Sequence, residues 1–302
     1  MAMPALTQSD SGLIDFNTPS VYRTGPFLIS LRSNYAPLLR LRSELYPGTE
    51  ADPADEIVDF HIAMRRPRLS RRWFRPNITF LLEDASPFEP YPLDHAFPLL
   101  EWGLNWCIAT LGHQHLMLHS AVLEREGKGL ILPALPGSGK STLCAALAMR
   151  GWRMLSDEFG LIRPSTGELL PLPRAVPLKN ESIDVIRNFD PAAHLGPVFP
   201  KTRKGTVSHM RPPQDALKRQ RDPATPRWVV FPRYRAGMKP ELTPITKPLA
   251  FNRLANNSFN YRLLGATGFR TLAAIIRGCD CYSYEYGDLE SAIATLNDEL
   301  FR

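Results

Sequence analysis

The chain has 302 residues, enough to bury one large hydrophobic core or two moderate ones. Its content of 44% hydrophobic and 22% charged residues is typical of a globular protein that is soluble in water. The net charge of +6 suits anionic ligands but is too small to indicate nucleic acid without a localised basic patch. We therefore do not expect nucleic acid as a partner.

The beginning of the chain and its apolar regions predict neither export nor a membrane span. Residues 1–10 lack a basic start followed by an apolar core. The longest apolar region, residues 99–111, contains Glu101 and Asn105 and is too short to cross a bilayer. Four cysteines in a chain of this length do not form a disulfide framework. We expect a cytoplasmic protein without a membrane partner.

Residues 1–95 predict a smaller N-terminal lobe of α+β character. Short alternating segments at residues 27–31 and 57–62 predict strands. The proline-rich stretch 87–92 marks the end of the lobe. A helix is expected from Leu93 to Leu111, and a second domain is assigned to residues 96–302.

An arginine-rich segment interrupted by Trp73 and Phe74 lies within the N-terminal lobe. Its basic members are Arg65, Arg66, Arg68, Arg71, Arg72 and Arg75. Basic and aromatic residues together can bind single-stranded nucleic acid. A solvated hairpin whose arginines protect strand edges is the favoured interpretation, and docking of an acidic peptide is a third.

Residues 116–123 predict a strand beside the one that leads into the most informative motif of the chain. This strand carries His119 among apolar residues. A single histidine in such a setting usually packs in the core. Its position next to the motif makes it a candidate catalytic residue.

The motif is Pro-Gly-Ser-Gly-Lys-Ser-Thr at residues 136–142, which follows an apolar run at 129–135 and precedes a helix-forming run at 143–150. A strand, a glycine loop and a helix in this order form a phosphate-binding site, in which backbone N–H groups of the loop surround phosphate oxygens. Lys140 is expected to reach the terminal phosphates, and the Ser141 hydroxyl is expected to bind Mg²⁺. The expected nucleotide contacts are Pro136, Gly137, Ser138, Gly139, Lys140, Ser141 and Thr142. The full pattern asks for glycine at the position of Ala134, five residues before Gly139.

Residues 154–162 read as one strand with two adjacent carboxylates, Asp157 and Glu158. Burying such a pair without partners is costly, which indicates a metal or the mouth of a site. One carboxylate is expected to hold Mg²⁺ and the other to accept a proton from an attacking hydroxyl.

Two basic segments further along are candidates for contacts with substrate or phosphate. Lys179 precedes Asn180, an expected N-cap of a helix that ends near Arg187. Residues 200–211 read as a glycine-containing basic loop that could close over a phosphoryl group. Its candidate residues are Arg203, Lys204 and Arg211. An exposed polar loop is an equal alternative.

The remaining chain predicts packing elements. Prolines between residues 212 and 232 favour loop structure. A helix at 269–277, a strand at 279–286 and a last helix capped by Asp288 complete the chain.

The succession of His119-Ser120-Ala121, residues 136–142 and Asp157-Glu158 resembles the HPr kinase/phosphorylase and phosphoenolpyruvate carboxykinase group, and more narrowly the HPr-kinase-related proteins often called kinase A. The resemblance covers approximately residues 110–300. It implies an α/β fold with a mixed sheet and a P-loop-containing core. It also implies that His119 lies near the γ-phosphate or metal, and that Asp157 and Glu158 divide metal binding and base work, with Asp157 as the base.

Two departures limit what the resemblance implies. The usual acidic pair of the group is Asp-Asp, whereas the second member here is Glu158. The Glu-Val-Arg-Gly-type signature of true HPr kinases is absent after the acidic strand, where residues 173–182 stand instead. The sequence therefore does not predict HPr as the acceptor, nor the reverse phosphorylase reaction.

From these motifs we expect an ATP- and Mg²⁺-dependent kinase that phosphorylates a hydroxyl, foremost a serine of a peptide or protein. A small-molecule kinase and a nucleotide-gated binding module without phosphotransfer are the alternatives. A carboxykinase is least favoured because its lysine metal ligand and substrate arginines are not found. A homo-oligomer remains open.

Overall fold

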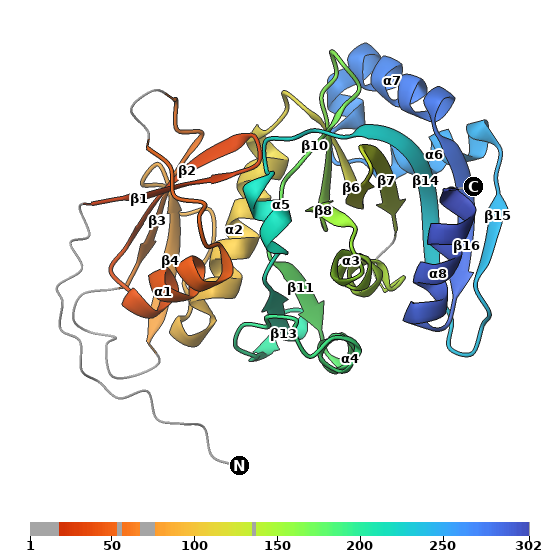
Figure 1. Ribbon diagram of the computed structural model, residues 1–302. Helices are drawn as coiled ribbons and strands as arrows, with labels where there is room; N and C mark the ends of the chain where they lie inside the picture. Colours follow the sequence, from red (N-terminus) through yellow and green to blue (C-terminus); the bar gives the residue numbers. More distant parts are fainter. Residues whose placement is uncertain (1–17, 53–55, 67–75, 135–136, 302) are drawn as a thin grey trace.

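The computed structural model describes residues 18–52, 56–66, 76–134 and 137–301. Within them the protein is mixed α/β, with three sheets and helices packed against them (Figure 1). Among these residues, no helix combines the length and the apolar composition that a membrane span requires. Pro136 and most of the arginine-rich segment, residues 67–75, lie outside the described residues.

The first sheet belongs to the N-terminal part of the chain. Its strands follow the order β1 (Ser20–Thr24), β2 (Phe27–Ser33), β3 (Phe60–Arg65), β4 (Asn77–Leu82) and β5 (Tyr91–Pro92). Helix α1 (Ala36–Leu45), the short 3₁₀ helix η2 (Leu93–His95) and helix α2 (Ala96–Leu111) accompany it. Buried side chains of α2 share one apolar cluster with this sheet, so the boundary expected after residue 95 lies just before a helix that packs on the N-terminal sheet.

The second sheet has eight strands and carries the glycine-rich motif. Its order is β10-β9-β6-β7-β14-β16-β15, and β8 pairs with β6 off this path. The strands are β6 (Leu116–Arg125), β7 (Lys128–Pro133), β8 (Arg153–Ser156), β9 (Phe159–Ile162), β10 (Leu169–Leu170), β14 (Thr225–Tyr234), β15 (Glu241–Pro244) and β16 (Asp280–Tyr286). Strands β7, β14 and β16 are parallel, so their carboxyl ends meet at one edge.

Helices cover both faces of the second sheet because its central strands are apolar on both sides. Along β7, Leu130 and Leu132 pack in one cluster with α3 (Lys140–Met149) and α8 (Leu289–Leu300). Ile131 points to the other face, in the cluster with α6 (Lys247–Asn256) and α7 (Tyr261–Gly278). This arrangement places the N-terminus of α3 directly after β7 (Figure 1).

The third sheet lies between these parts in Figure 1. It has the order β11 (Val176–Lys179), β13 (Gly205–Met210) and β12 (Phe199–Thr202), all antiparallel. Helix α4 (Glu181–Phe189) follows β11, and the short α5 (Gln214–Lys218) follows β13.

Three local predictions were wrong. Residues 154–162 are not one strand: the Ser156 hydroxyl accepts a hydrogen bond from the Phe159 backbone N–H, and this turn separates β8 from β9. The basic segment 200–211 is largely a β-hairpin, because β13 pairs with both β11 and β12. Residues 212–232 include most of β14, which accommodates Pro226 at a shift in its register with β7.

Candidate functional site

The glycine loop, defined here as Gly137, Ser138 and Gly139, lies at the carboxyl end of β7 and leads into α3. Gly137 and Gly139 have φ angles of 85° and 87°, in the left-handed region that side chains rarely adopt. Lys140 is the first residue of α3. The loop therefore directs the N–H groups of a helix start towards the sheet edge, where an anion is favoured.

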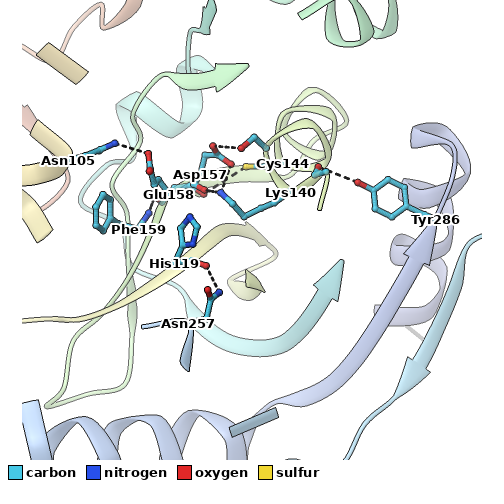
Figure 2. Close-up of polar contacts among 12 residues, drawn as sticks. Asn105, His119, Lys140, Cys144, Asp157, Glu158, Phe159, Asn257 and Tyr286 are labelled. Atoms are coloured by element: carbon cyan, nitrogen blue, oxygen red, sulfur yellow. Dashed lines mark hydrogen bonds and ion pairs between the residues drawn. The ribbon is translucent and has the colours of Figure 1, made fainter. Parts of the chain in front are cut away.

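Two tyrosines fix the glycine loop to the neighbouring parallel strands. The Tyr234 N–H at the end of β14 donates to the Ser138 carbonyl at 3.0 Å. The Tyr286 hydroxyl at the end of β16 donates to the Gly139 carbonyl at 3.2 Å, as Figure 2 shows. A Cβ atom on Gly139 would lie 2.6 Å from that hydroxyl and 2.9 Å from the Tyr234 Cβ. The loop is thus held in a shape that leaves no room for a side chain at this position.

Alanine substitutions at the two glycines should separate backbone strain from this close contact. Gly137→Ala meets no atom within 4 Å and should cost only the left-handed penalty, about 1–2 kcal/mol. Gly139→Ala has the same penalty and also displaces Tyr286, so we expect a larger loss of unfolding free energy in urea titrations. Equal losses in the two variants would contradict the tight anchoring of the loop.

Lys140, Ser141 and Asp157 form the polar centre of the site. The Lys140 ammonium donates to the Asp157 backbone carbonyl and lies 3.2 Å from its Oδ1 atom. The Ser141 hydroxyl donates to Asp157 Oδ2 at 2.8 Å. Asp157 is only 5% exposed, and Figure 2 shows Lys140 directed at it. The predicted phosphate lysine, metal serine and carboxylate are therefore in direct contact.

The residues present fit a triphosphate and Mg²⁺. The Ser138 hydroxyl is buried without a hydrogen-bond partner in the described protein, a costly state that a phosphate oxygen would relieve. Mg²⁺ commonly binds one or two carboxylates together with substrate phosphates and waters, and Ser141 with Asp157 supplies such a partial set. Among the described residues, no group of three or more His, Cys, Asp or Glu side chains could hold a metal by itself.

Glu158 points away from Lys140 and belongs to a second polar network. Asn105 on α2 donates through Nδ2 to Glu158 Oε2 at 2.7 Å. The Arg174 guanidinium donates to Asn105 Oδ1, and to Glu101 Oε2 at 2.6 Å. The Tyr46 hydroxyl donates to the other Glu101 oxygen at 2.9 Å. The N-terminal part of the chain thereby positions the second carboxylate.

The sequence interpretation missed Asn105, Arg174, Glu101 and Tyr46 as site residues. Glu101 and Asn105 were noted only as polar interruptions of an apolar helix, four residues apart and hence on one helical face. That spacing was the one signal that could have identified them. The sequence contains no comparable signal for Tyr46.

A hollow opens beside the carboxylate pair, between α2 and the third sheet. The cavity volume is about 30 Å³, which is room for one or two water molecules. Its polar lining includes Glu101, Asn105, Asp157, Glu158, Arg174, Lys204 and His209, and Trp102, Phe159, Leu172, Ala175 and Pro177 form apolar walls. A second, more open depression shares four of these residues and adds Arg203. Glu158 lines both the hollow and this depression, whose volume is about 270 Å³.

His119 lies on β6 within electrostatic reach of Lys140 and the carboxylate pair. Burial and the Lys140 charge lower the pKa of His119, while Glu158 and Asp157 oppose this effect. Its backbone carbonyl accepts from the Asn257 side chain at 2.7 Å (Figure 2). Its ring packs against Phe259. The surroundings of the half-buried imidazole therefore favour its neutral form.

The other predicted basic contacts separate into two groups. Lys204 lines the hollow and Arg203 the outer depression, whereas half-buried Arg211 makes no polar side-chain contact with the site among the described residues. Burial and Lys204 lower the pKa of Lys179, and Glu158 and Asp157 raise it, which places Lys179 in the same electrostatic neighbourhood.

Asn180 occupies the N-cap position of α4, but its side chain does not cap the helix and instead accepts from Thr206 N–H. Thr142 is half-buried in the first turn of α3.

His209 should make the stability of the protein pH-dependent. Its ring is 1% exposed, and burial, with Arg174, lowers its pKa to about 3. The unfolded chain takes up this proton below about pH 6.5, so the contribution of neutral His209 to stability is complete above that pH and declines as the pH falls towards 3. Between pH 6.5 and 5 the loss should be about 2 kcal/mol.

The His209→Gln variant should lose this part of the pH dependence. Urea unfolding of both proteins between pH 7 and 5 measures it, because the other histidines contribute equally to both curves. Parallel curves would show that His209 titrates normally in the folded protein.

Comparisons with known proteins do not add a family to these observations. The chain matches no protein-family model, and no curated protein is similar to it. Function must therefore be inferred from the geometry of the site.

Proposed function

We propose that the protein is an ATP- and Mg²⁺-dependent phosphotransferase that transfers the γ-phosphate to a hydroxyl, foremost a serine of a peptide or protein. The single observation that carries this proposal is the direct contact of Lys140 and Ser141 with Asp157 at the end of the glycine loop. A loop that only connected a strand to a helix would not require a buried lysine, serine and carboxylate in contact. The resemblance to HPr-kinase-related proteins and a P-loop core agrees with this proposal.

The glycine loop and Lys140 bind the phosphates. The N–H groups of the loop and of the first turn of α3 donate to phosphate oxygens, and Ser138 contributes its free hydroxyl. Lys140 exchanges its contact with the Asp157 carboxylate for the terminal phosphates. Ser141 and Asp157 would hold Mg²⁺, which would supply positive charge against the phosphates.

Glu158 faces the acceptor. It lines the hollow and is held by Asn105, whereas Asp157 already contacts the lysine and serine of the phosphate side. Asp157 as the base is a prediction from the resemblance, and these contacts favour Glu158 for that role instead. In this assignment Glu158 orients the acceptor hydroxyl and accepts its proton. Neutral His119 donates a hydrogen bond near the transferred γ-phosphate.

The experiment that tests the proposal follows phosphate from labelled ATP. The protein and its Lys140→Ala variant are incubated with Mg²⁺, ATP and a host extract, and phosphorylated residues are located by mass spectrometry. We expect serine phosphorylation that disappears with the variant. Label on small molecules would indicate a metabolite kinase, and release of free phosphate alone would indicate an ATPase. Partner binding that needs ATP but neither Asp157 nor Glu158 would indicate a nucleotide-gated module.

A further inference from the structure

Three exposed cations lie near the entrance to the hollow. Lys179, Arg203 and Lys204, here called the basic rim, are exposed at the ends of β11 and of the β12–β13 hairpin. Within the described ranges of the chain, none of the three takes part in an ion pair with a carboxylate. Other exposed cations, such as Lys128 and Lys218, also have no carboxylate partner among the described residues. What distinguishes Arg203 and Lys204 is their place beside the hollow and the open depression.

Aromatic rings of the N-terminal part hold two of these cations over the opening. The Arg203 guanidinium lies 5.6 Å from the centre of the Tyr91 ring, and the Lys204 ammonium lies 5.7 Å from that of Trp102. Cations over aromatic faces at this separation are attracted to the ring. Trp102 and Lys204 also line the hollow itself. The ring contacts therefore keep the charges of Arg203 and Lys204 at the entrance.

The inside of the hollow has a different character. Its walls include Trp102, Leu172 and Pro177, and Glu158 is the carboxylate positioned by Asn105. The buried His209 has a ring nitrogen, Nδ1, without a hydrogen-bond partner in the described protein. A short neutral side chain with a hydroxyl suits this interior, whereas a carboxylate suits the rim.

We propose that the acceptor is a peptide segment in which a serine is flanked by acidic residues. This inference rests on the proposed phosphotransfer and names its substrate class. The serine enters the open depression beside Glu158, and the acidic neighbours contact the basic rim. The serine oxygen forms a bond to the γ-phosphorus as the bond to the β,γ-bridging oxygen breaks. The serine proton passes to Glu158, and ADP leaves with the electron pair of the broken bond.

The same cations could instead serve the nucleotide, and the experiment separates the two roles. Serine peptides with flanking Asp, Ala or Lys residues are offered to the wild type and to the Arg203→Glu and Lys204→Glu variants. Lys128→Glu is the matched control, because Lys128 is an exposed cation at the opposite end of β7 from the glycine loop. Mg-ATP affinity is measured for every protein by calorimetry.

We expect the wild type to phosphorylate the Asp-flanked peptide with a kcat/KM about tenfold or more above that of the Ala-flanked peptide. Each rim variant should lower kcat/KM for the acidic peptide about tenfold, mainly by raising KM. The same variants should raise kcat/KM for the Lys-flanked peptide. The Mg-ATP affinity should stay unchanged, and Lys128→Glu should behave as the wild type.

Two results would overturn the inference while leaving the proposed function intact. Phosphorylation of all peptides without preference would show that the rim does not select the acceptor. Loss of Mg-ATP affinity in the rim variants, matching the loss of turnover, would assign the rim to the nucleotide. Absence of Mg-ATP binding by the folded wild type would instead remove the proposed function, and the acceptor inference with it.

Discussion

Replacing Glu158 by glutamine should reduce kcat by about 10²–10⁴-fold while leaving the affinity for Mg-ATP nearly unchanged. Glutamine keeps the length of the side chain and an oxygen that can accept from Asn105, so the network around the hollow is preserved. What is lost is the carboxylate that takes the proton of the acceptor. Single-turnover phosphorylation and calorimetric titration with Mg-ATP measure the two quantities separately.

Two variants complete this test. Asp157→Asn should weaken the Mg²⁺ dependence of nucleotide binding, because Asp157 contacts Ser141 and Lys140. Glu126→Gln, at an exposed turn at the other end of β7, should change neither quantity. If Glu158→Gln retained full turnover and Asp157→Asn lost it with normal Mg-ATP binding, Asp157 would be the base and the assignment made here would be reversed.

Replacing Arg174 by alanine should destabilise the protein by about 3–5 kcal/mol. Arg174 is buried and joins Glu101 on one side to Asn105 on the other. Its removal leaves the Glu101 carboxylate buried with only the Tyr46 hydroxyl as a partner from the described network. The free energy of unfolding in urea at neutral pH measures this cost.

A matched arginine provides the control for this prediction. Arg163 also pairs with a glutamate, Glu168, but the two side chains are 42% and 35% exposed. Because water screens such a pair, Arg163→Ala should cost less than about 1 kcal/mol. Similar losses in the two variants would show that burial does not amplify the role of Arg174.

We also expect Arg174 to position Glu158 through Asn105. This role can be measured separately from its contribution to stability. In conditions where Arg174→Ala remains folded, Asn105 loses one partner and Glu158 loses its fixed orientation. We expect kcat to fall while the affinity for Mg-ATP is retained. Arg174→Lys should restore activity only in part, because one ammonium group cannot reproduce the planar fork that reaches both neighbours.

The elements around the glycine loop could be predicted from the sequence because their determinants are local. An apolar run of strand length, glycines at 137 and 139 and a helix-forming run define β7, the loop and α3 within about 20 residues. The same holds for the capped helix α8, whose Asp288 side chain accepts from Ser291 N–H. In these segments local preference and tertiary packing favour the same structure.

The second half of the site could not be predicted because it depends on contacts distant in sequence. Glu158 is oriented by a helix residue 53 positions earlier, and Arg174 meets Glu101 across 73 positions. The hairpin at residues 199–210 forms because its second strand adds to β11, a partner that no local pattern specifies. The sequence pattern therefore identified Lys140, Ser141 and Asp157, which lie in contact, and missed the residues that orient Glu158.

Calorimetric titration of the folded protein with ATP, in the presence and absence of Mg²⁺, is the decisive measurement for nucleotide binding at the glycine loop. We expect saturable uptake of one Mg-ATP per chain that requires Mg²⁺ and is lost in Lys140→Ala, with the variant shown to be folded by circular dichroism. Absence of Mg-ATP uptake by folded wild-type protein would contradict this expectation.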